Sequence, residues 1–208
     1  MTDASIKPRR VGTPCPRAAF ESDSVGSGCS PHALNASLSE ALPELRLTVR
    51  AETAADMDFS ASLYALTRKA ELAQVDWPSA TKHSFCRQQF DAQHAHYRQH
   101  YPHAQFLLIE CEGMPAGRLY FEQTANELRL MEITLLGESR NLGIGGALSR
   151  ALLQQAHACG VAMGLHVEPF NPARRLYERQ GFREVEERGF YLYMRCEPPS
   201  ALAAILFG

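Results

Sequence analysis

A glycine-rich turn joins a strand-like run to a helix-like run in the second half of the chain. Residues 128 to 136 are typical of a buried strand, and residues 143 to 159 repeat apolar side chains at helical spacing. Gly143, Gly145 and Gly146 at the junction let a ligand approach the backbone, where the first N–H groups of a helix lack helical acceptors. The sequence therefore predicts an α/β unit with a phosphate or pyrophosphate site at this turn.

The same junction could belong to a dinucleotide-binding fold, whose fingerprint is Gly-x-Gly-x-x-Gly in a tight turn at the strand end. The third glycine of that fingerprint would stand where this chain has Leu148. Residues 137 to 140 also separate the turn from the strand, although Glu168 stands at a later strand end, as a ribose-binding acid would. The missing glycine favours a phosphate-bearing ligand other than NAD.

A second motif, Asn171-Pro-Ala-Arg-Arg-Leu-Tyr-Glu-Arg-Gln-Gly-Phe182, follows after one more strand-like run. Together with Arg140-x-x-Gly143-x-Gly145, it resembles the GCN5-related N-acetyltransferase (GNAT) superfamily over roughly residues 128 to 195. The resemblance implies an α/β acyl-CoA N-acyltransferase fold, with a mixed, mostly antiparallel sheet of about seven strands flanked by four helices. It also implies acetyl-CoA as the acyl-donor substrate. The matching positions of the second motif are Ala173, Leu176, Tyr177, Gly181 and Phe182.

Hydrophobic periodicity divides the chain into one domain with two flanking segments. Residues 1 to 44 are rich in Ser, Pro, Gly and Ala, so we expect a flexible N-terminal arm. The acetyltransferase domain is expected over residues 45 to 197, and a tail over residues 198 to 208. The predicted helices cover 56 to 73, 79 to 101, 143 to 159 and 172 to 180, and the predicted strands cover 45 to 50, 105 to 110, 117 to 122, 128 to 136, 161 to 168, 182 to 186 and 190 to 196.

The composition argues against several classes of protein. A net charge of −2 gives no electrostatic reason to bind nucleic acid or an anionic membrane, and no apolar run approaches the roughly 20 residues of a membrane span. The six cysteines have no regular spacing and no Cys-x-x-Cys pair, which favours a reducing cytoplasm over a disulfide framework. We therefore expect a cytoplasmic protein without nucleic-acid or membrane partners, and a homodimer stays open.

The resemblance implies which residues contact acetyl-CoA. The turn would hold the pyrophosphate, and the end of the preceding strand would pair its backbone with the pantetheine arm, like an added strand. Asn171 stands six residues before Tyr177 instead of the usual seven, where Phe170 stands, so its alternative role is to cap the helix that follows. The implied cofactor-binding residues are Ile133, Thr134, Leu135, Arg140, Asn141, Leu142, Gly143, Ile144, Gly145, Gly146, Asn171 and Tyr177.

The resemblance also implies catalytic roles. Tyr177 would protonate the departing thiolate as a general acid, with a core aromatic residue as the alternative reading. A backbone N–H near Leu135 would stabilise the oxyanion of the tetrahedral intermediate. His166 and Glu168 share one face of a predicted strand and are the candidates for general base, and Glu132 is a third. A hydrogen-bonded polar pair is the alternative for His166 and Glu168.

Two histidines, His96 and His100, are four residues apart on a predicted helix, as metal ligands can be. The residue after the first is Tyr97, where a zinc protease has glutamate, and no acidic residue or cysteine nearby completes a ligand set. We expect a solvated helix face and no metal site.

The sequence thus predicts an N-acetyltransferase that moves an acetyl group from acetyl-CoA to a primary amine by direct attack in a ternary complex. A non-catalytic acyl-CoA-binding sensor or regulatory module, and another nucleotide-binding α/β domain, are the alternatives. The acceptor, a small-molecule or peptide amine, is expected beneath the two N-terminal helices near Trp77, Tyr64 and Tyr101. Its identity stays open.

Overall fold

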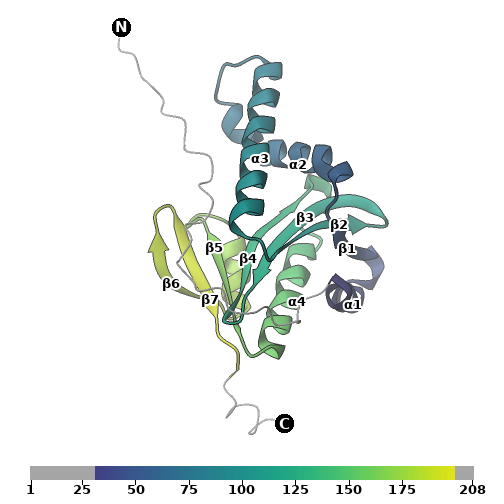
Figure 1. Cartoon of the computed structure of the whole chain (residues 1–208), viewed down its shortest axis with the longest axis vertical. Coiled ribbons are helices and arrows are strands. Elements are labelled where there is room, and N and C mark those ends of the chain that lie inside the picture. Colours follow the sequence, from purple (N-terminus) through teal and green to yellow (C-terminus); the bar gives the residue numbers. More distant parts are fainter. Residues whose placement is uncertain (1–30, 200–208) are drawn as a thin grey trace.

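The computed structural model describes residues 31–199, which form a seven-stranded sheet with helices on both faces (Figure 1). The strand order is β1-β2-β3-β4-β5-β7-β6, and every pair is antiparallel except β4 with β5. This is the predicted mixed, mostly antiparallel sheet. The strands are β1 (Leu47–Ala51), β2 (Ala104–Cys111), β3 (Met114–Gln123), β4 (Glu127–Leu135), β5 (Ala162–Val167), β6 (Arg183–Arg188) and β7 (Tyr191–Cys196).

Four of the five α-helices lie where periodicity predicts them. The described helices are α1 (Pro31–Ala41), α2 (Met57–Leu72), α3 (Ser79–His100), α4 (Ile144–Ala158) and α5 (Ala173–Arg179), with short 3-10 helices η1 (Pro43–Leu45), η2 (Ala54–Asp56) and η3 (Gly137–Ser139). The prediction of four helices omitted α1.

Alternation along the strands divides the core between the two faces of the sheet. Leu119 and Phe121 of β3 pack in the main core with α4 and α1, whereas Tyr120 between them packs with Tyr97 of α3. The α4 face is the larger apolar layer, since Leu148 and other α4 side chains are fully buried in it. The face beneath α2 and α3 contains aromatic and charged residues. The candidate site lies in the sheet, which separates these two helical layers.

The expectation of a flexible arm over residues 1 to 44 is wrong for residues 31 to 41, which form helix α1. Leu34 and Leu38 are 0% exposed in the main core, and the Asn35 side chain pairs with the backbone of Val49, accepting from its N–H at 2.6 Å and donating to its carbonyl at 3.0 Å. The polar, small-residue composition hides a spacing of four between buried leucines. The rest of that arm, and residues 200 to 208 of the predicted tail, lie outside the described residues.

Strands β4 and β5 pair only at their first halves. The parallel ladder ends at Leu130 opposite Leu165, while β4 continues to Leu135 paired with β3 alone. A β-bulge accompanies this change, because Tyr120 lies opposite Glu132 and Phe121 opposite Leu130, so that Met131 is the extra residue. We call the unpaired stretch beyond Leu130 and Leu165 the split.

Candidate active site at the split between β4 and β5

The backbone of β4 offers hydrogen-bonding groups to the split. The N–H of Leu136 donates to the carbonyl of Ala116 on the β3 side at 2.9 Å. Because alternate residues of an antiparallel ladder face the same neighbour, Thr134 also faces β3, and Ile133 and Leu135 direct N–H and C=O into the split. Two of the three residues expected to pair with pantetheine therefore have the required backbone direction, and Thr134 does not.

Side-chain direction also changes at the bulge. Before it, Leu128 and Leu130 belong to the core beneath α4, and after it Ile133 and Leu135 pack against that same core. Glu132 therefore points to the opposite face, beneath α2 and α3. The bulge thus places a carboxylate on one side of β4 and backbone donors along its edge.

The turn after β4 has the backbone geometry of an anion site. Asn141 and Gly143 are in the left-handed region, at φ 62° and 83°, a conformation that Asn and Gly tolerate best. The hydrogen bond from the Ala147 N–H to the Gly143 carbonyl, at 2.9 Å, opens the helical ladder, so the N–H groups of residues 144 to 146 precede it. A pyrophosphate fits this row of donors beside the exposed Arg140.

The three glycines of the turn have different structural roles. Gly143 supplies the left-handed backbone conformation. A Cβ on Gly145 would meet nothing within 4 Å, so this position is open to a ligand, whereas a Cβ on Gly146 would lie 3.4 Å from Leu176 of α5. Arg140 donates from Nε to the Leu135 carbonyl at 3.0 Å, which links the turn to the end of β4.

Tyr177 lies in α5, partly buried against the main core, with its ring centroid 5.7 Å from that of Phe182. Burial raises the pKa of Tyr177, so the phenol keeps its proton at neutral pH, as a general acid requires. Gln180 of the same stretch donates to the Gly146 carbonyl at 3.0 Å and accepts from the buried Ser149 hydroxyl at 2.9 Å. These bonds hold the tyrosine helix on the turn; the sequence reading missed Gln180.

The two base candidates at the end of β5, His166 and Glu168, differ in how far they are buried. His166 is one residue past the last β4–β5 pair, with its ring centroid 4.9 Å from that of Tyr193. Burial, then the charges of Arg129 and Arg188, lower the pKa of His166 to about 4, so it is neutral at physiological pH and a weak base. Glu168 is exposed in the loop after β5.

Glu132 is a better ordered carboxylate than Glu168. Its Oε1 accepts from Arg118 Nε at 2.6 Å and from the Thr134 hydroxyl at 2.7 Å, and its side chain is 15% exposed. The sequence offers Glu132 as a third candidate because a carboxylate inside a strand needs a partner or a function, and Arg118 is that partner.

Asn171 makes the capping contact that its sequence position allows. Its Oδ1 accepts from the Ala173 N–H at 2.9 Å, which occupies that oxygen at the start of α5. The side-chain amide nitrogen is the group left to contact a ligand.

Two of the three residues predicted to line the acceptor region beneath α2 and α3 are buried in the core. Tyr64 and Tyr101 are 5% and 3% exposed, so they are core residues that a substrate cannot touch, while Trp77 is 41% exposed. Their spacing on the helices gave no means of telling a core stripe from a binding surface.

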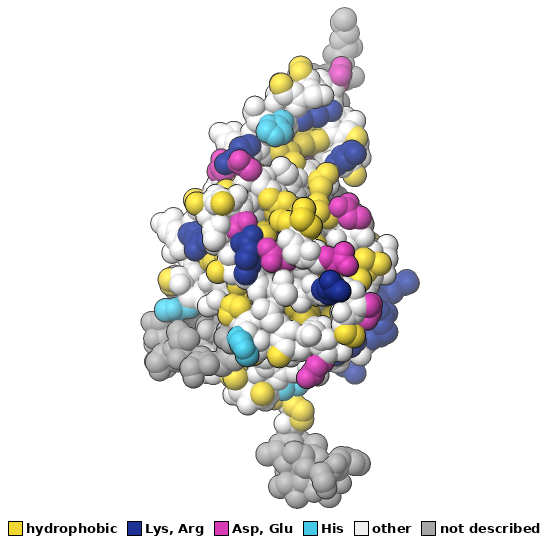
Figure 2. Space-filling model, turned by 90° about the vertical axis from the view of Figure 1, so that its right-hand side faces the viewer, with side chains coloured by type: hydrophobic (Ala, Val, Ile, Leu, Met, Phe, Trp, Pro, Cys, Tyr) yellow, Lys and Arg dark blue, Asp and Glu magenta, His cyan; other side chains and the backbone are white. Residues whose placement is uncertain are grey.

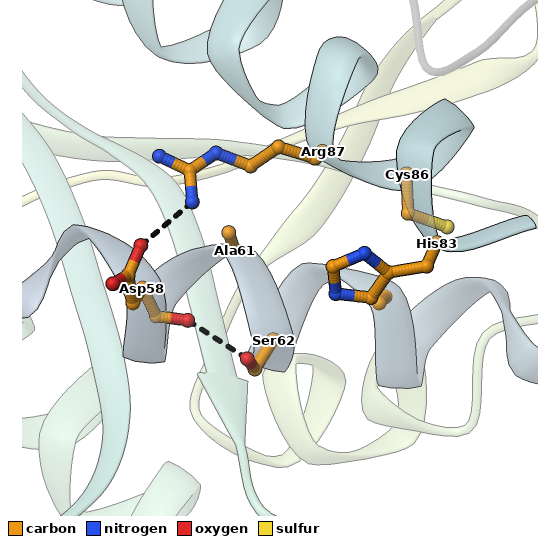
Figure 3. A pocket seen from close by; sticks show the side chains of 7 residues that line it. Asp58, Ala61, Ser62, His83, Cys86 and Arg87 are labelled. Atoms are coloured by element: carbon orange, nitrogen blue, oxygen red, sulfur yellow. Dashed lines mark hydrogen bonds and ion pairs between the residues drawn. The ribbon is translucent and has the colours of Figure 1, made fainter. Parts of the chain in front are cut away.

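A groove runs between α2 and α3, with cavities of about 270 and 350 Å³ lined by these helices and by Ala73, the residue that follows α2. Small side chains such as Ala61 leave it open, and the ion pair of Arg87 with Asp58 at 2.7 Å crosses it near one end (Figure 3). None of the predicted site residues lines either cavity. On the face shown in Figure 2, acidic and basic side chains are interspersed among hydrophobic ones.

Between residues 31 and 199, no group of three or more His, Cys, Asp or Glu side chains is arranged to hold a metal ion. Within the same range, no helix combines the length and apolar character that crossing a bilayer requires.

Comparisons with known proteins agree with this geometry. The sequence model of the Acetyltransferase (GNAT) family matches residues 69–182, more than half of the chain. The structure resembles the PaiA N-acetyltransferase of Thermoplasma acidophilum, solved in complex with coenzyme A, with TM-score 0.56 and 17% identity over 73% of this chain and 98% of that one. It also resembles the ribosomal-protein-S18-alanine N-acetyltransferase of Escherichia coli, with TM-score 0.52 and 18% identity over 74% of this chain and 96% of that one. A search of curated proteins finds no match.

At these low identities, the two structural matches establish a shared fold only. The match to the family model shows the relationship at the level of sequence. The predicted acyl-CoA N-acyltransferase fold is confirmed. Acetyl-CoA is the acyl donor of this family, and a ribosomal L7/L12 alpha-N-protein acetyltransferase of the same fold was likewise solved with coenzyme A.

Proposed function

We propose that this chain, which belongs to the Acetyltransferase (GNAT) family, transfers the acetyl group of acetyl-CoA to a primary amine by direct attack in a ternary complex. The observation that carries the proposal is the direction of the Ile133 and Leu135 backbone into the split, beside the open N–H groups of the turn. These groups lie on one edge and could bind the pantetheine arm and the pyrophosphate of one molecule. A pure phosphate-binding turn would not need the unpaired half of β4.

The reaction needs three groups at the split. The amine nitrogen attacks the thioester carbonyl, a C–N bond forms, and the Leu135 N–H stabilises the oxyanion. Collapse breaks the C–S bond, and the Tyr177 hydroxyl donates its proton to the departing thiolate. The amine loses its proton to a base, directly or through water, and this proton can restore the phenol by way of solvent. Binding both reactants in one complex supplies much of the rate acceleration.

Glu132 is our preferred proton acceptor. The choice rests on position, because Glu132 lies on β4, the strand whose free backbone edge borders the split. Glu168 is exposed to solvent, whereas Glu132 is fixed by two donors. His166 and Glu168 remain alternatives, and single substitutions to Gln at the three positions separate them by the loss of kcat.

The free thiols of four cysteines favour a reducing compartment, and we propose the cytoplasm as the location. Cys86, Cys111, Cys159 and Cys196 form no disulfide within the described part of the chain. Fractionation of cells expressing the tagged full chain tests the assignment, and recovery in a membrane or secreted fraction would contradict it.

Binding and turnover are tested in sequence. Acetyl-CoA should raise the melting temperature of the full chain, while NAD and ATP should not. Gly145→Asp places a negative side chain in the open turn and should abolish the acetyl-CoA shift; Gly137→Asp, at an equally open position in η3, is the matched control. Coenzyme A release is then measured with a broad panel of amines and amino-terminal peptides. Binding without release from any amine would favour the non-catalytic module.

A further inference from the structure

Arg118 of β3 is the largest of the side chains that are fully buried in the described structure. Its side chain is 2% exposed, and its guanidinium carbon lies 5.3 Å from the ring centroid of Phe90 and 5.1 Å from that of Tyr120. Taking a charge out of water is costly unless it is paired and hydrogen-bonded. An arginine in this position therefore needs a reason.

The guanidinium contacts point to Glu132. Nε donates to Glu132 Oε1 at 2.6 Å, Nη2 lies 2.6 Å from the same oxygen, and Nη2 also donates to Gln93 at 3.4 Å. The other buried carboxylate on this face, Glu52, is engaged by the Tyr120 hydroxyl at 2.9 Å and 3.0 Å. The close ion pair of Arg118 is thus with Glu132.

The contacts fix the orientation of the carboxylate. Arg118 and Thr134 are opposite each other on β3 and β4, and both donate to Oε1 of Glu132. Every hydrogen bond that residues 31–199 donate to Glu132 ends at Oε1, and Oε2 is the oxygen left to meet a substrate or water. The carboxylate is held from one side and open on the other.

We infer that Arg118 is a positioning residue for acetyl transfer, which fixes Glu132 so that its second oxygen can take the proton of the acceptor amine. The inference rests on the proposed function. It predicts that Arg118 acts through Glu132 and not through general support of the core. Met can fill the space of the Arg118 side chain, but it leaves the Glu132 carboxylate without its partner, and breaking such a pair from one side lowers stability. The melting temperature of each variant without ligand is therefore measured beside its kcat.

A double-mutant cycle distinguishes the two roles. We compare wild type, Arg118→Met, Glu132→Gln and the double variant, measuring kcat at saturating acetyl-CoA with the best amine of the panel. Arg118→Met should lower kcat by about 10²-fold in the wild-type background and by less than about threefold in the Glu132→Gln background. The thermal shift with acetyl-CoA should persist in all four proteins, which separates loss of catalysis from loss of the cofactor site.

Losses that multiply in the double variant, or an unchanged kcat in Arg118→Met, would overturn the positioning role. If Arg118→Met does not fold, Thr134→Val provides the test, because it removes a single hydrogen bond to the same oxygen. Thr134→Val should lower kcat by about 3- to 10-fold in the wild-type background. It should cause no further loss in the Glu132→Gln background. Equal losses in both backgrounds would again overturn the inference. Failure of wild type to release coenzyme A with any amine would instead contradict the proposed function.

Discussion

Gly117 of β3 lies against the end of β4 that we propose stabilises the oxyanion, and its replacement by alanine tests that proposal. A Cβ there would overlap the carbonyl oxygen of Thr134 and lie 2.8 Å from Leu135 Cδ2 and 3.2 Å from Leu135 Cα. Two of these three atoms belong to the backbone and cannot move by changing a rotamer. Restoring normal contact distances requires β3 and β4 to separate by roughly 1 Å at Leu135.

That displacement should affect stability and catalysis separately. Overpacking of this kind costs about 1 to 3 kcal/mol, which lowers the melting temperature of a domain this size by about 3 to 10 °C. Moving the Leu135 N–H by about 1 Å from the oxyanion should lower kcat by about 10²-fold.

Differential scanning calorimetry and initial rates measure the two effects of Gly117→Ala. Gly137→Ala is the control, because a Cβ on Gly137 meets nothing within 4 Å. If Gly117→Ala melts at a lower temperature as expected but keeps its kcat, then the backbone of β4 does not have the catalytic role argued above. An unchanged melting temperature would contradict the close packing of β3 on β4.

Three other predictions concern separate parts of the structure. Tyr177→Phe should lower kcat by about 10²-fold and leave acetyl-CoA affinity within about twofold; an unchanged rate would remove Tyr177 from the mechanism. The pKa of His166 is lowered in the folded state to about 4, so the unfolded chain binds more protons between pH 4 and 6.5, and stability should fall as pH falls through that window. His166→Gln should flatten the urea-unfolding free energy over this range, and an identical pH dependence would contradict the burial of a neutral imidazole. Leu38→Ala in α1 should cost about 2 to 5 kcal/mol in urea unfolding, whereas Leu66→Ala, 48% exposed, should cost little; equal losses would contradict the packing of α1.

Local patterns were enough to predict most of the elements. Apolar alternation predicts β2, β3 and β4, and the three-to-four residue spacing predicts α2, α3 and α4 close to their observed bounds. Helix α1 escaped because only two of its side chains, Leu34 and Leu38, are buried, within a stretch whose composition is typical of a linker. Composition reports the average of a segment, whereas burial depends on a few positions in register with the core.

The candidate site was predictable only where a residue acts through its own backbone or its place in a motif. The turn and Tyr177 fall in that class. The Arg118–Glu132 pair and the Gln180 bridge join strands or helices distant in sequence, and no local pattern encodes such a contact. The bulge at Met131 leaves one local trace in the sequence, a change of phase in the core-facing positions from Leu128 and Leu130 to Ile133 and Leu135, which the prediction of a single buried strand did not use.

The bond between Asn35 and Val49 has a consequence for how the molecule behaves among its own copies. An edge strand with free N–H and C=O groups is a template for further strands, and so a risk of aggregation. The amide of Asn35 pairs with the N–H and C=O of Val49 on β1, as one residue of a neighbouring strand would. The opposite edge, β6, relies on charge instead, with Arg183, Glu184, Glu186 and Glu187 exposed along it. Removal of α1 should therefore have two effects. It should lower the stability of the domain, and it should expose the backbone of the edge strand β1 to pairing with other copies of the chain.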